Sequence, residues 1–508
     1  MSSRPLVLPA DSHNEELVSN VHPADWINPR PAGRYNLVVI GAGSAGLITA
    51  AIAAGLGAKV ALVERHLMGG DCLNVGCVPS KSLIRAARMI TEAHRAEQFG
   101  LHMHAAAKVD FGAAMERMRK IRSQISGEDS ARRYRDELGV DVFLGDAHFA
   151  NSDTVEVDGV PLRFRKAVIA TGARPAAPEI AGLEAVGYLT NESIFELTHR
   201  PNRLGVIGSG PIGSELAQVF RRFGCEVAVL EQSRHILPRE DADAAQIVQK
   251  RFEREGIRLA LGCKVEKIDA REAGKRIELT TAEGNTDSFD VDEVLVSVGR
   301  APNVEGLNLE AIGVDYDDRR GVHVNDYLQT TNPRIYAAGD IAMAWKFTHA
   351  ADAAAKIVVQ NALFLRTKKL SSLVMPWCTY TDPEVAHVGL YVHEAAELGI
   401  ELSTFQVSLK DVNRAVTDSE EEGFVKVHVK KGSDRILGAT IVASHAGEMI
   451  SEVTLAMVNK LGLGAILKTI HPYPTQAEAL KRAAGAYMRS RATPRVGRFL
   501  ERFMALRR

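Results

Sequence analysis

Two copies of one glycine-rich pattern constrain the fold of this chain more than any other feature of its sequence. In the first copy, an apolar strand at 35–40 leads into Gly41-Ala42-Gly43-Ser44-Ala45-Gly46, an alanine-rich helix follows, and the next strand ends at Glu64. In the second, a strand at 203–207 leads into Gly208-Ser209-Gly210-Pro211-Ile212-Gly213, and the next strand ends at Glu231. A strand, a G-x-G-x-x-G turn, a helix and a strand ending in an acid are typical of a dinucleotide-binding βαβ unit. The sequence therefore predicts an α/β protein with two Rossmann-like units.

Each copy supplies the groups that such a unit needs. The glycines let the backbone approach a pyrophosphate at the helix N-terminus, where the helix dipole favours an anion, and the acid accepts from a ribose hydroxyl. The candidate cofactor-binding residues are Gly41, Gly43, Ser44, Ala45, Gly46 and Glu64 in the first copy, and Gly208, Gly210, Ile212, Gly213 and Glu231 in the second. The copies begin 167 positions apart and predict two dinucleotide sites. Decay of one copy is the alternative, although both glycine sets and both acids are intact.

A pair of cysteines follows the first copy. Cys72 and Cys77 lie five positions apart in the run GGDCLNVGCVPSK at 69–81. A helical arc of little more than one turn would bring their sulfurs within reach of each other, so the pair could alternate between disulfide and dithiol. Gly76 and Pro79 would interrupt a regular helix and favour a bulged turn. Two structural cysteines or half of a zinc site are the alternatives, but zinc ligands usually come with a second Cys or His pair nearby.

Composition limits the classes of function. A chain of 508 residues should form two to four domains, and a net charge of −1 argues against nucleic acid as the main partner. Five cysteines in so long a chain do not make a disulfide framework and fit a reducing compartment, so we expect a cytoplasmic protein. The first ten residues lack the pattern of a signal peptide. Residues 37–58 carry no charge and could span a bilayer, but the glycine motif within them favours a buried strand–helix–strand.

Four further motifs complete the pattern: Ala170-Thr171-Gly172, Ala338-Gly339-Asp340, Tyr380-Thr381-Asp382-Pro383-Glu384 and His471-Pro472-Tyr473-Pro474-Thr475. With these, the sequence resembles the flavoprotein disulfide reductases over roughly residues 35–490. That group contains dihydrolipoamide dehydrogenase, glutathione reductase and mercuric reductase. The resemblance implies FAD at the first glycine turn, NADH or NADPH at the second, and a C-terminal domain that forms a homodimer.

The resemblance also implies a division of the chain into domains. We expect an N-terminal arm at 1–34, an FAD-binding domain at 35–184 and 302–370, and an NAD(P)-binding domain at 185–301. A C-terminal α+β dimerisation domain should follow at 371–490 and a basic tail at 491–508.

Specific roles follow from the resemblance. Cys77 would be the thiolate beside the flavin and Cys72 the outer thiol that meets the substrate. Lys81 and Glu215 resemble the ion pair that orients the nicotinamide end, although Lys81 could also be an exposed helix lysine. Asp71 replaces the usual threonine before the first cysteine, and we expect its charge to weaken thiolate formation at Cys72. The further cofactor-binding residues that the resemblance implies are Gly70, Asp71, Lys81, Ala147, Thr171, Gly172, Gly299, Arg300, Gly339 and Asp340.

The informative departure from the family lies near the C-terminus. In the members that exchange thiols and disulfides, a histidine directly precedes Pro-Thr, five residues ahead of a glutamate, and acts as acid and base for the substrate thiol. Here Tyr473 holds that place ahead of Glu478, with His471 two positions earlier. A phenol holds its proton too tightly at neutral pH to shuttle it for thiols, and a tyrosine here resembles mercuric reductase. His471 could do the proton work if the turn aims it at the sulfurs, or it could be structural.

The sequence therefore favours an NAD(P)H-dependent oxidoreductase that resembles mercuric reductase and acts on a metal ion or a small oxidised acceptor. A dihydrolipoamide-dehydrogenase-like enzyme that uses His471 is the alternative. Mercuric reductases carry a C-terminal cysteine pair and often an N-terminal C-x-x-C, and this chain has neither, which argues against mercury. Glu231 would repel a 2′-phosphate and favours NADH, whereas Ser233 and Arg234 could accommodate that phosphate.

The C-terminal tail is basic and amphipathic. The last 20 residues hold seven arginines and one acid, with Phe499, Leu500, Phe503, Met504 and Leu506 among them. Such a tail could contact acidic lipid, as in a membrane-surface carrier that passes electrons to quinone, or it could be a solvated or oligomer-contacting helix. The remaining cysteines, Cys225, Cys263 and Cys378, are expected to be packing residues; for Cys378 a position near the active site is the alternative.

Overall fold

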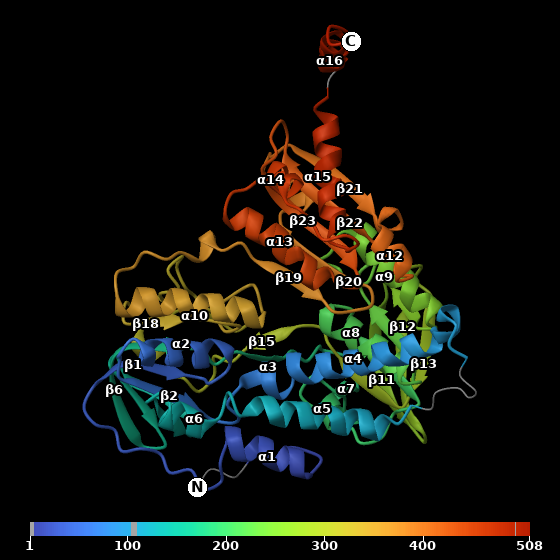
Figure 1. Ribbon diagram of the computed structural model, residues 1–508. Coiled ribbons are helices and arrows are strands. Elements are labelled where there is room, and N and C mark those ends of the chain that lie inside the picture. The colour runs from blue at the N-terminus through green and yellow to red at the C-terminus, as the bar shows by residue number, and fades with distance from the viewer. Residues whose placement is uncertain (1–4, 103–108, 493) are drawn as a thin grey trace. The chain divides into compact units, whose positions relative to one another are not determined.

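The computed structural model of the protein describes residues 5–102, 109–492 and 494–508 (Figure 1). Residues 1–4 of the expected arm and residue 493 of the expected tail lie outside these ranges. The chain forms two compact units. The first comprises Met1–Gln232 and Ile257–Leu373, and the second comprises Ser233–Gly256 and Val374–Arg508.

A seven-stranded sheet carries the first glycine turn. Its order is β3-β2-β1-β6-β5-β4, with β18 also paired to β6. The strands are β1 (Tyr35–Ile40), β2 (Val60–Glu64), β3 (Asp141–Leu144), β4 (Ala147–Asn151), β5 (Thr154–Val157), β6 (Val160–Ile169) and β18 (Ile335–Ala337). β1 is parallel to both its neighbours and buried along most of its length, as expected for a strand covered on both faces. The uncharged stretch at 37–58 is thus β1, the helix α2 (Ser44–Gly55) and their connection, and α10 (Thr348–Leu363) packs beside α2 (Figure 1).

A four-stranded parallel sheet, in the order β10-β9-β8-β14, carries the second glycine turn. Its strands are β8 (Arg203–Ile207), β9 (Glu226–Glu231), β10 (Arg258–Leu261) and β14 (Glu293–Val296), and α8 (Pro211–Arg222) follows the turn. The antiparallel strands β11 (Lys264–Arg271), β12 (Gly274–Thr280) and β13 (Thr286–Val291) form a sheet beside it, and β15 (Arg300–Pro302) pairs with β7 (Ala173–Pro175). The two predicted Rossmann-like units are therefore present.

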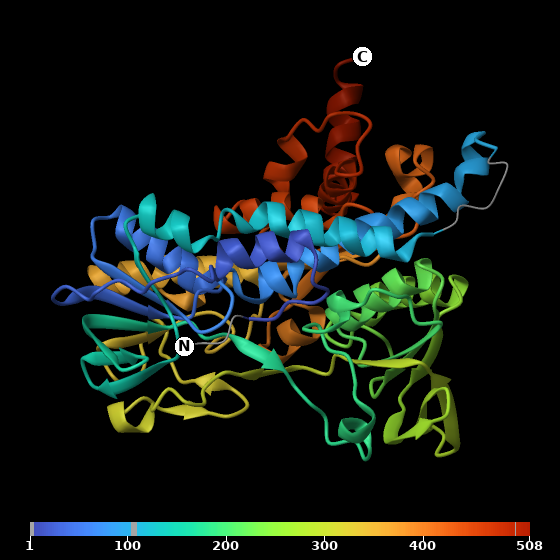
Figure 2. The ribbon, with the colours of Figure 1, turned by 90° about the horizontal axis from the view of Figure 1, so that it is seen from below.

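Helices packed side by side carry the cysteine run (Figure 2). They are α1 (Ser12–Val21), α3 (Gly70–Asn74), α4 (Cys77–His94), α5 (Phe111–Ser126) and α6 (Ala131–Asp136). The sequence predicted that Pro79 would interrupt a regular helix, but α4 begins at Cys77 and Pro79 lies in its first turn, where the missing N–H removes no intrahelical bond. Helices α5 and α6 are separate, since Ser130 caps the start of α6 by accepting from Arg133 N.

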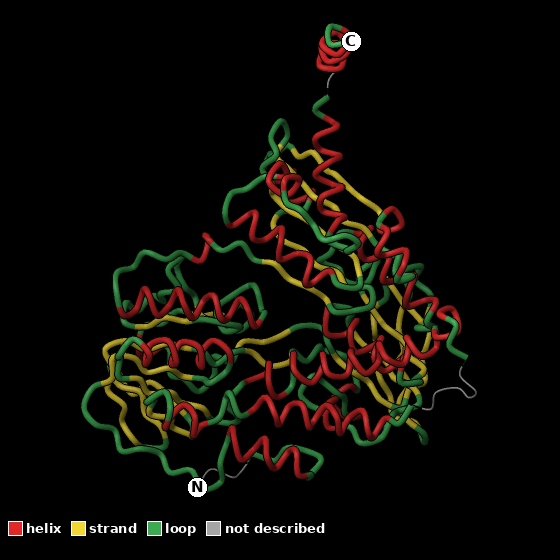
Figure 3. The backbone as a smooth tube through the Cα atoms, viewed as in Figure 1, coloured by secondary structure: helices red, strands yellow, loops and turns green. Residues whose placement is uncertain are grey.

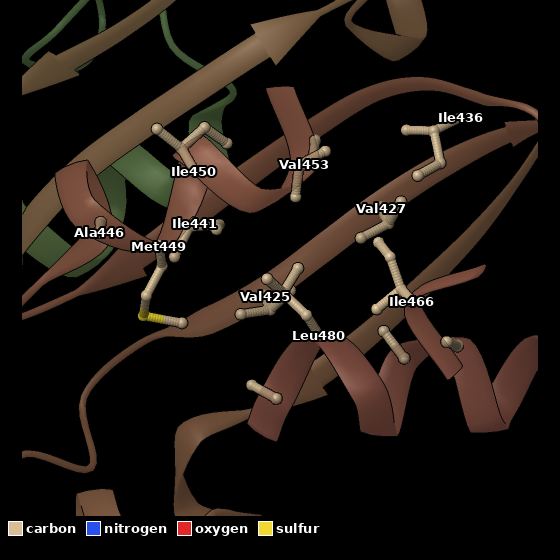
Figure 4. Packing of buried hydrophobic residues seen from close by; sticks show 14 of the residues in the cluster. Val425, Val427, Ile436, Ile441, Ala446, Met449, Ile450, Val453, Ile466 and Leu480 are labelled. Atoms are coloured by element: carbon tan, nitrogen blue, oxygen red, sulfur yellow. The ribbon is translucent and has the colours of Figure 1, made fainter. Parts of the chain in front are cut away.

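The second unit is built on an antiparallel sheet in the order β19-β20-β23-β22-β21. Its strands are β19 (Pro376–Thr379), β20 (Glu384–Gly389), β21 (Leu402–Ser408), β22 (Phe424–Lys430) and β23 (Ile436–Ala443). Residues of α13 (Ala446–Val458), α14 (Leu463–Lys468) and α15 (Glu478–Ser490) pack against it, and Figure 4 shows Ile450 and Val453 of α13 over Val425 and Val427 of β22. The yellow strands and red helices of this α+β unit are distinguished in Figure 3. Cys378 packs against the same core.

Residues 233–256 belong to this second unit because a buried lysine ties them to its sheet. Lys426 on β22 is 6% exposed and pairs with Asp241 at 2.6 Å and Asp243 at 2.9 Å, beside α9 (Ala242–Arg254). The shorter elements of the chain are α7 (Leu183–Val186), α11 (Val392–Glu397), α12 (Asn413–Thr417), α16 (Pro494–Ala505), β16 (Tyr316–Asp317) and β17 (Gly321–Val322). No helix in the described ranges is long and apolar enough to cross a membrane.

Candidate active site

The first glycine turn forms a tight cradle at the N-terminus of α2. Gly41 has φ +101°, and a Cβ there would lie 2.3 Å from the Ala170 carbonyl oxygen. A Cβ on Gly46 would lie 1.8 Å from the oxygen of Gly41, so only glycine fits at both positions. Gly43 is the N-cap of α2 and has no side chain that could accept from the first-turn amides. These amides can therefore donate to an anion such as a pyrophosphate. Ser44 and Ala45 are the first two residues of the helix.

Glu64 braces this cradle at the end of β2. Its carboxylate accepts from the Ala42 amide at 2.7 Å and from the His66 amide at 2.8 Å. Burial raises the pKa of Glu64. The acid is thus at the place where the sequence predicted it, at the carboxyl end of the strand beside the glycine turn.

Two further stretches close on the same turn. Gly70 has φ +56°, and a Cβ there would lie 2.6 Å from the Cα of Gly43. Gly339, just after β18, has φ +84°, and a Cβ there would lie 3.1 Å from the Cβ of Ala45. The cysteine run and the Ala-Gly-Asp motif therefore meet the first cradle, as residues that surround one bound cofactor must.

The second glycine turn repeats the cradle. Gly208 has φ +94°, a Cβ on Gly213 would lie 2.1 Å from the oxygen of Gly208, and Gly210 caps α8 without a side chain. Glu231 accepts from both the amide and the hydroxyl of Ser209 at 2.8 Å. Ile212 lies in the first turn of α8 and is 39% exposed. Both cradles therefore have the geometry that a dinucleotide needs.

Arg300 joins two of the remaining predicted residues, Asp71 and Asp340. Its guanidinium is 15% exposed, donates to the carboxylate of Asp71, and lies 3.3 Å from that of Asp340. Burial raises the pKa of Asp340, and Arg300 opposes this shift. Because Arg300 compensates the charge of Asp71, that aspartate does not bring an isolated negative charge next to Cys72.

Other predicted cofactor residues lie on nearby turns. The Thr171 hydroxyl donates to the Asn303 carbonyl at 2.9 Å, and Asn303 Nδ2 donates back to the Thr171 carbonyl at 2.9 Å. Gly172 has φ +69° and Gly299 has φ +148°, so both need glycine's backbone freedom. Ala147 begins β4, away from this turn in the sheet order, where it pairs with Val157.

The cysteine pair is electronically asymmetric. Cys72 donates a hydrogen bond to Cys77, which lowers the pKa of Cys77 to about 6; Lys81 and a hydrogen bond from Thr348 act in the same direction. The same contact with Cys77 and burial raise the pKa of Cys72. Cys77 is also the first residue of α4, where the helix dipole favours an anion. These pKa shifts favour a thiolate at Cys77 and a thiol at Cys72, and neither cysteine is in a disulfide in the structure.

Lys81 forms an ion pair with Glu215. Its Nζ lies 2.9 Å from Glu215 Oε2, and Glu215 is 4% exposed. The pair links α4, which carries Cys77, to α8, which follows the second glycine turn. Lys81 is thus the partner of a buried carboxylate and not merely an exposed helix lysine.

The predicted C-terminal residues have separate surroundings in the second unit. Tyr473 is 70% exposed and accepts from Asn413 Nδ2 at 2.8 Å. The His471 ring is 5% exposed and is held by Glu452 at 3.0 Å and by the Thr469 carbonyl at 3.2 Å. Arg482 donates to one oxygen of Glu478 at 3.1 Å, while the other, buried oxygen has no hydrogen-bond partner among the described residues.

Sequence reasoning missed Thr348, whose hydroxyl lies 3.4 Å from Cys77 Sγ. The two residues are 271 positions apart, and no motif marks the start of α10. It also missed Asn303 and the arginine described below that contacts the cysteine run. Cys225 and Cys263 are buried in the first unit, as expected of packing residues.

Two dinucleotide cradles and a polarised cysteine pair define a dinucleotide-dependent dithiol–disulfide oxidoreductase. Comparison with known families agrees: residues 35–355 match the pyridine nucleotide-disulphide oxidoreductase family and residues 375–484 match its dimerisation domain. The chain belongs to this family. It is therefore an FAD-containing, NAD(P)H-dependent flavoprotein enzyme, and the predicted fold class, with two Rossmann-like units and a C-terminal α+β domain, is confirmed.

Curated relatives and solved structures cover most of the chain. A mercuric reductase of Lysinibacillus sphaericus is 37% identical over 89% of this chain and 82% of its own length. A dihydrolipoyl dehydrogenase of Chlamydia muridarum is 34% identical over 89% of this chain and 96% of its own. The HOCl-induced flavoprotein disulfide reductase RclA of Escherichia coli, solved as a Cu(II) complex, is 26% identical with a TM-score of 0.80 over 90% of this chain and 100% of its own.

Proposed function

We propose that this enzyme uses NADH to reduce a thiophilic metal ion, with Cys72 and Cys77 as the redox pair that receives the electrons. Bound in the two cradles, FAD and the nicotinamide supply two-electron transfer to a disulfide. For mercuric ion, the acceptor named for several relatives, the overall reaction is NADH + Hg²⁺ → NAD⁺ + H⁺ + Hg⁰. The same redox pair would serve another two-electron acceptor of this class. We further propose that the enzyme is a homodimer and that it acts in the cytoplasm.

The asymmetry of the cysteine pair is the observation that carries this proposal. A thiolate at Cys77, beside the protonated Cys72, offers the soft sulfur ligands that thiophilic metals prefer.

The surroundings of His471 favour a metal acceptor over a lipoamide. Disulfide substrates need an acid and base for the leaving thiol, and both ring nitrogens of His471 are already engaged by Glu452 and Thr469. The exposed residue of the motif is Tyr473, a hydrogen-bonding group that is a poor proton shuttle for thiols. Metal reduction needs no such shuttle.

An acceptor panel with matched variants at position 473 tests this proposal. Purified holoenzyme is assayed anaerobically for NADH and NADPH oxidation with mercuric chloride or with oxidised lipoamide. We expect wild type to prefer the metal, and Tyr473→His to raise lipoamide turnover by about 10²-fold, the usual contribution of an acid–base group. Tyr473→Phe, which keeps the ring, should not gain lipoamide activity. Lipoamide turnover in wild type that exceeds metal turnover would overturn the proposal in favour of a dihydrolipoyl dehydrogenase.

Cofactor preference is tested in the same assay. Glu231 lies at the end of β9, where its negative charge would oppose a ribose 2′-phosphate, so we propose NADH as the reductant. A lower KM for NADPH than for NADH would contradict this assignment.

A second property is favoured by the C-terminal helix α16. Its apolar side chains are exposed, with Phe499 at 66%, Phe503 at 40% and Met504 at 56%, and five arginines and one glutamate accompany them over 494–508. Basic amphipathic helices of this kind bind the surface of anionic membranes. We propose that α16 attaches the enzyme peripherally to anionic lipid.

A further inference from the structure

The helix α1 precedes the part of the chain that matches the family, yet it packs in the layer that holds the cysteine run. The family match begins at residue 35, and α1 spans Ser12–Val21. The helix packs along α5 (Figure 2), and its buried residues are Asn14, Leu17, Val18 and Val21. The Val21 carbonyl also accepts from the Met68 amide at 3.2 Å, just ahead of the cysteine run.

A buried arginine connects α1 to the chain between the two cysteines. Arg122 of α5 is 3% exposed; Nη2 donates to Asn14 Oδ1 at 2.7 Å, and Nη1 donates to the Asn74 carbonyl at 2.6 Å. Burial lowers the pKa of Arg122 to about 10. A buried guanidinium is costly to desolvate, so its hydrogen bonds determine whether the arrangement is stable.

Asn14 is itself fixed, so it can orient the arginine. The side chain is 2% exposed, and its Nδ2 donates to the Pro9 carbonyl at 2.8 Å. Its amide donates to the capping residue Asp11 at 2.9 Å, and Asp11 also pairs with Arg119. The orientation of Asn14 therefore comes from the residues around the start of α1.

The contact with Asn74 falls at the end of α3, between Cys72 and Cys77. Carbonyls at the end of a helix lack intrahelical donors, and here the Asn74 carbonyl is satisfied by Arg122 and the Val75 carbonyl by Asn191 at 3.2 Å. The Asn74 side chain donates back to the carbonyls of Met68 and Gly70 at 3.0 and 2.9 Å. The segment that links the two sulfurs is thus held by side chains on both sides.

We propose that Asn14 and Arg122 are positioning residues for the redox pair: through the Asn74 carbonyl, the N-terminal helix holds the 72–77 segment in the geometry that lets the two sulfurs join. The inference rests on the proposed role of Cys72 and Cys77. Preorganising two reacting groups raises their effective concentration, so the fixed segment favours the disulfide over the dithiol. Loosening the segment should therefore make the disulfide easier to reduce.

The chain offers a matched control for this effect. Ser123 on α5 donates to Glu16 of α1 at 2.7 Å, so Ser123→Ala weakens the packing of the same two helices without touching Arg122 or Asn74. Asn14→Asp keeps an oxygen that can accept from Arg122, whereas Asn14→Leu removes it at similar volume. Arg122→Met removes the donor itself.

The test measures the dithiol–disulfide equilibrium of the purified holoenzyme. Each variant is equilibrated with mixtures of reduced and oxidised dithiothreitol; two electrons and two protons pass from the protein dithiol to the oxidised reagent as the protein S–S bond forms. The thiols are then trapped with an alkylating agent, and Cys72 and Cys77 are counted by mass spectrometry. Folded protein is isolated by gel filtration beforehand, and the free energy of unfolding of each variant is measured in urea.

We expect Asn14→Leu and Arg122→Met to lower the equilibrium constant for disulfide formation about tenfold, which corresponds to about 30 mV. Asn14→Asp and Ser123→Ala should stay within about twofold of wild type. Equal equilibrium constants for disulfide formation in all variants would overturn the inference. It would also be overturned if the constant fell in proportion to the lost free energy of unfolding in Ser123→Ala as well as in Asn14→Leu, because the effect would then follow stability alone. A wild type in which Cys72 and Cys77 form no exchangeable disulfide would instead refute the proposed redox pair, and the inference with it.

Discussion

At the scale of single residues, Lys81 is placed to set the reactivity of Cys77. Its charge is one of the causes that lower the pKa of Cys77 to about 6, and it is held by the buried Glu215. Lys81→Met removes the positive charge and leaves the Glu215 carboxylate unpaired by Lys81, and both changes raise the pKa of Cys77. Because the thiolate exists above the pKa, less of it remains at pH 6.5. We expect alkylation of Cys77 by iodoacetamide at pH 6.5 to slow about threefold for a rise of one pKa unit, because the thiolate fraction then falls from roughly three quarters to roughly one quarter.

The pH dependence separates this effect from a structural one. The alkylation rate of wild type should rise through a midpoint near pH 6, and that of Lys81→Met should rise through a higher midpoint and reach the same plateau. Arg85→Met removes an exposed charge of α4 that pairs with Glu92 and serves as the control. An unchanged midpoint in Lys81→Met would show that this lysine does not tune the thiol.

Arg300 stabilises two carboxylates at once. Arg300→Met removes the partner of Asp71 and Asp340. Breaking this mostly buried ion pair should lower the free energy of unfolding by about 2 kcal/mol. The loss is smaller than for a fully buried pair because the side chain of Asp71 is 40% exposed. The pKa of Asp340, already raised by burial, rises further without the arginine. A carboxyl whose pKa is raised in the native state destabilises the protein at pH values above that pKa, and protonation removes this cost. The stability lost in Arg300→Met should therefore be smaller at pH 5 than at pH 7.

Urea unfolding at the two pH values measures this deficit. Adding Asp71→Asn to Arg300→Met should recover part of the lost stability, because one of the two opposed carboxylates is gone. A deficit that is independent of pH and of Asp71 would mean that Arg300 acts through packing alone.

Residue types with a fixed local spacing could be predicted from the sequence, and long-range partners could not. The glycines at 41, 46, 208 and 213 follow from a motif whose tight backbone contacts exclude any other residue. Thr348 beside Cys77 and Arg122 beside Asn74 come from other helices, and neither spacing nor composition marks them. Arg300 compensates the charge of Asp71 from 229 positions away, so the charge of Asp71 could be predicted but its partner could not.

At the scale of elements, the strands were more predictable than the helix boundaries. Strands β1 and β8 span the predicted residues 35–40 and 203–207, because apolar, β-branched runs define them locally. The start of α4 could not be predicted, because a proline can either break a helix or lie in its first turn. In the structure Cys77 is the first residue of the helix, so Pro79 lies in the first turn. Helix α1 lies in a polar, proline-rich lead-in, where its packing against α5 outweighs a weak local signal.

Helix α13 exposes large apolar side chains to solvent. Its Leu455 and Val458 are 64% and 57% exposed, and Leu461 and Ile470 beyond it are 47% and 89% exposed. Exposed apolar clusters of this kind mark association surfaces, and the segment lies within the match to the dimerisation domain. We expect the double variant Leu455→Glu, Val458→Glu to weaken the proposed homodimer at least about tenfold, because two charges would be buried at the contact.

Light scattering after gel filtration checks this expectation. Wild type should have twice the chain mass of 55.1 kDa, and the double variant should dissociate on dilution at concentrations where wild type does not. Met488→Glu, which adds charge at an exposed site on α15, is the control. A variant that remains as dimeric as wild type would move the interface elsewhere.

At the scale of the whole molecule, the C-terminal helix can be deleted while every residue of both cradles and of the cysteine pair is kept. Deletion of 494–508 removes five arginines and the apolar face formed by Phe499, Phe503 and Met504. Each arginine near an anionic bilayer contributes roughly 1 kcal/mol, and the apolar face adds to this. We expect the full chain to co-sediment with vesicles that contain phosphatidylserine, and the deleted form to lose most of this binding while it keeps its rate of NADH oxidation.

Two controls distinguish the contributions to this binding. Higher salt screens exposed charges and should weaken vesicle binding several-fold, whereas neutral phosphatidylcholine vesicles should bind weakly at any salt concentration. Phe499→Ser, Phe503→Ser keeps every arginine, so residual salt-sensitive binding by this variant isolates the electrostatic part. Equal binding of the full and deleted chains would assign lipid contact to another surface, and loss of NADH oxidation on deletion would mean that α16 serves the catalytic unit rather than a membrane.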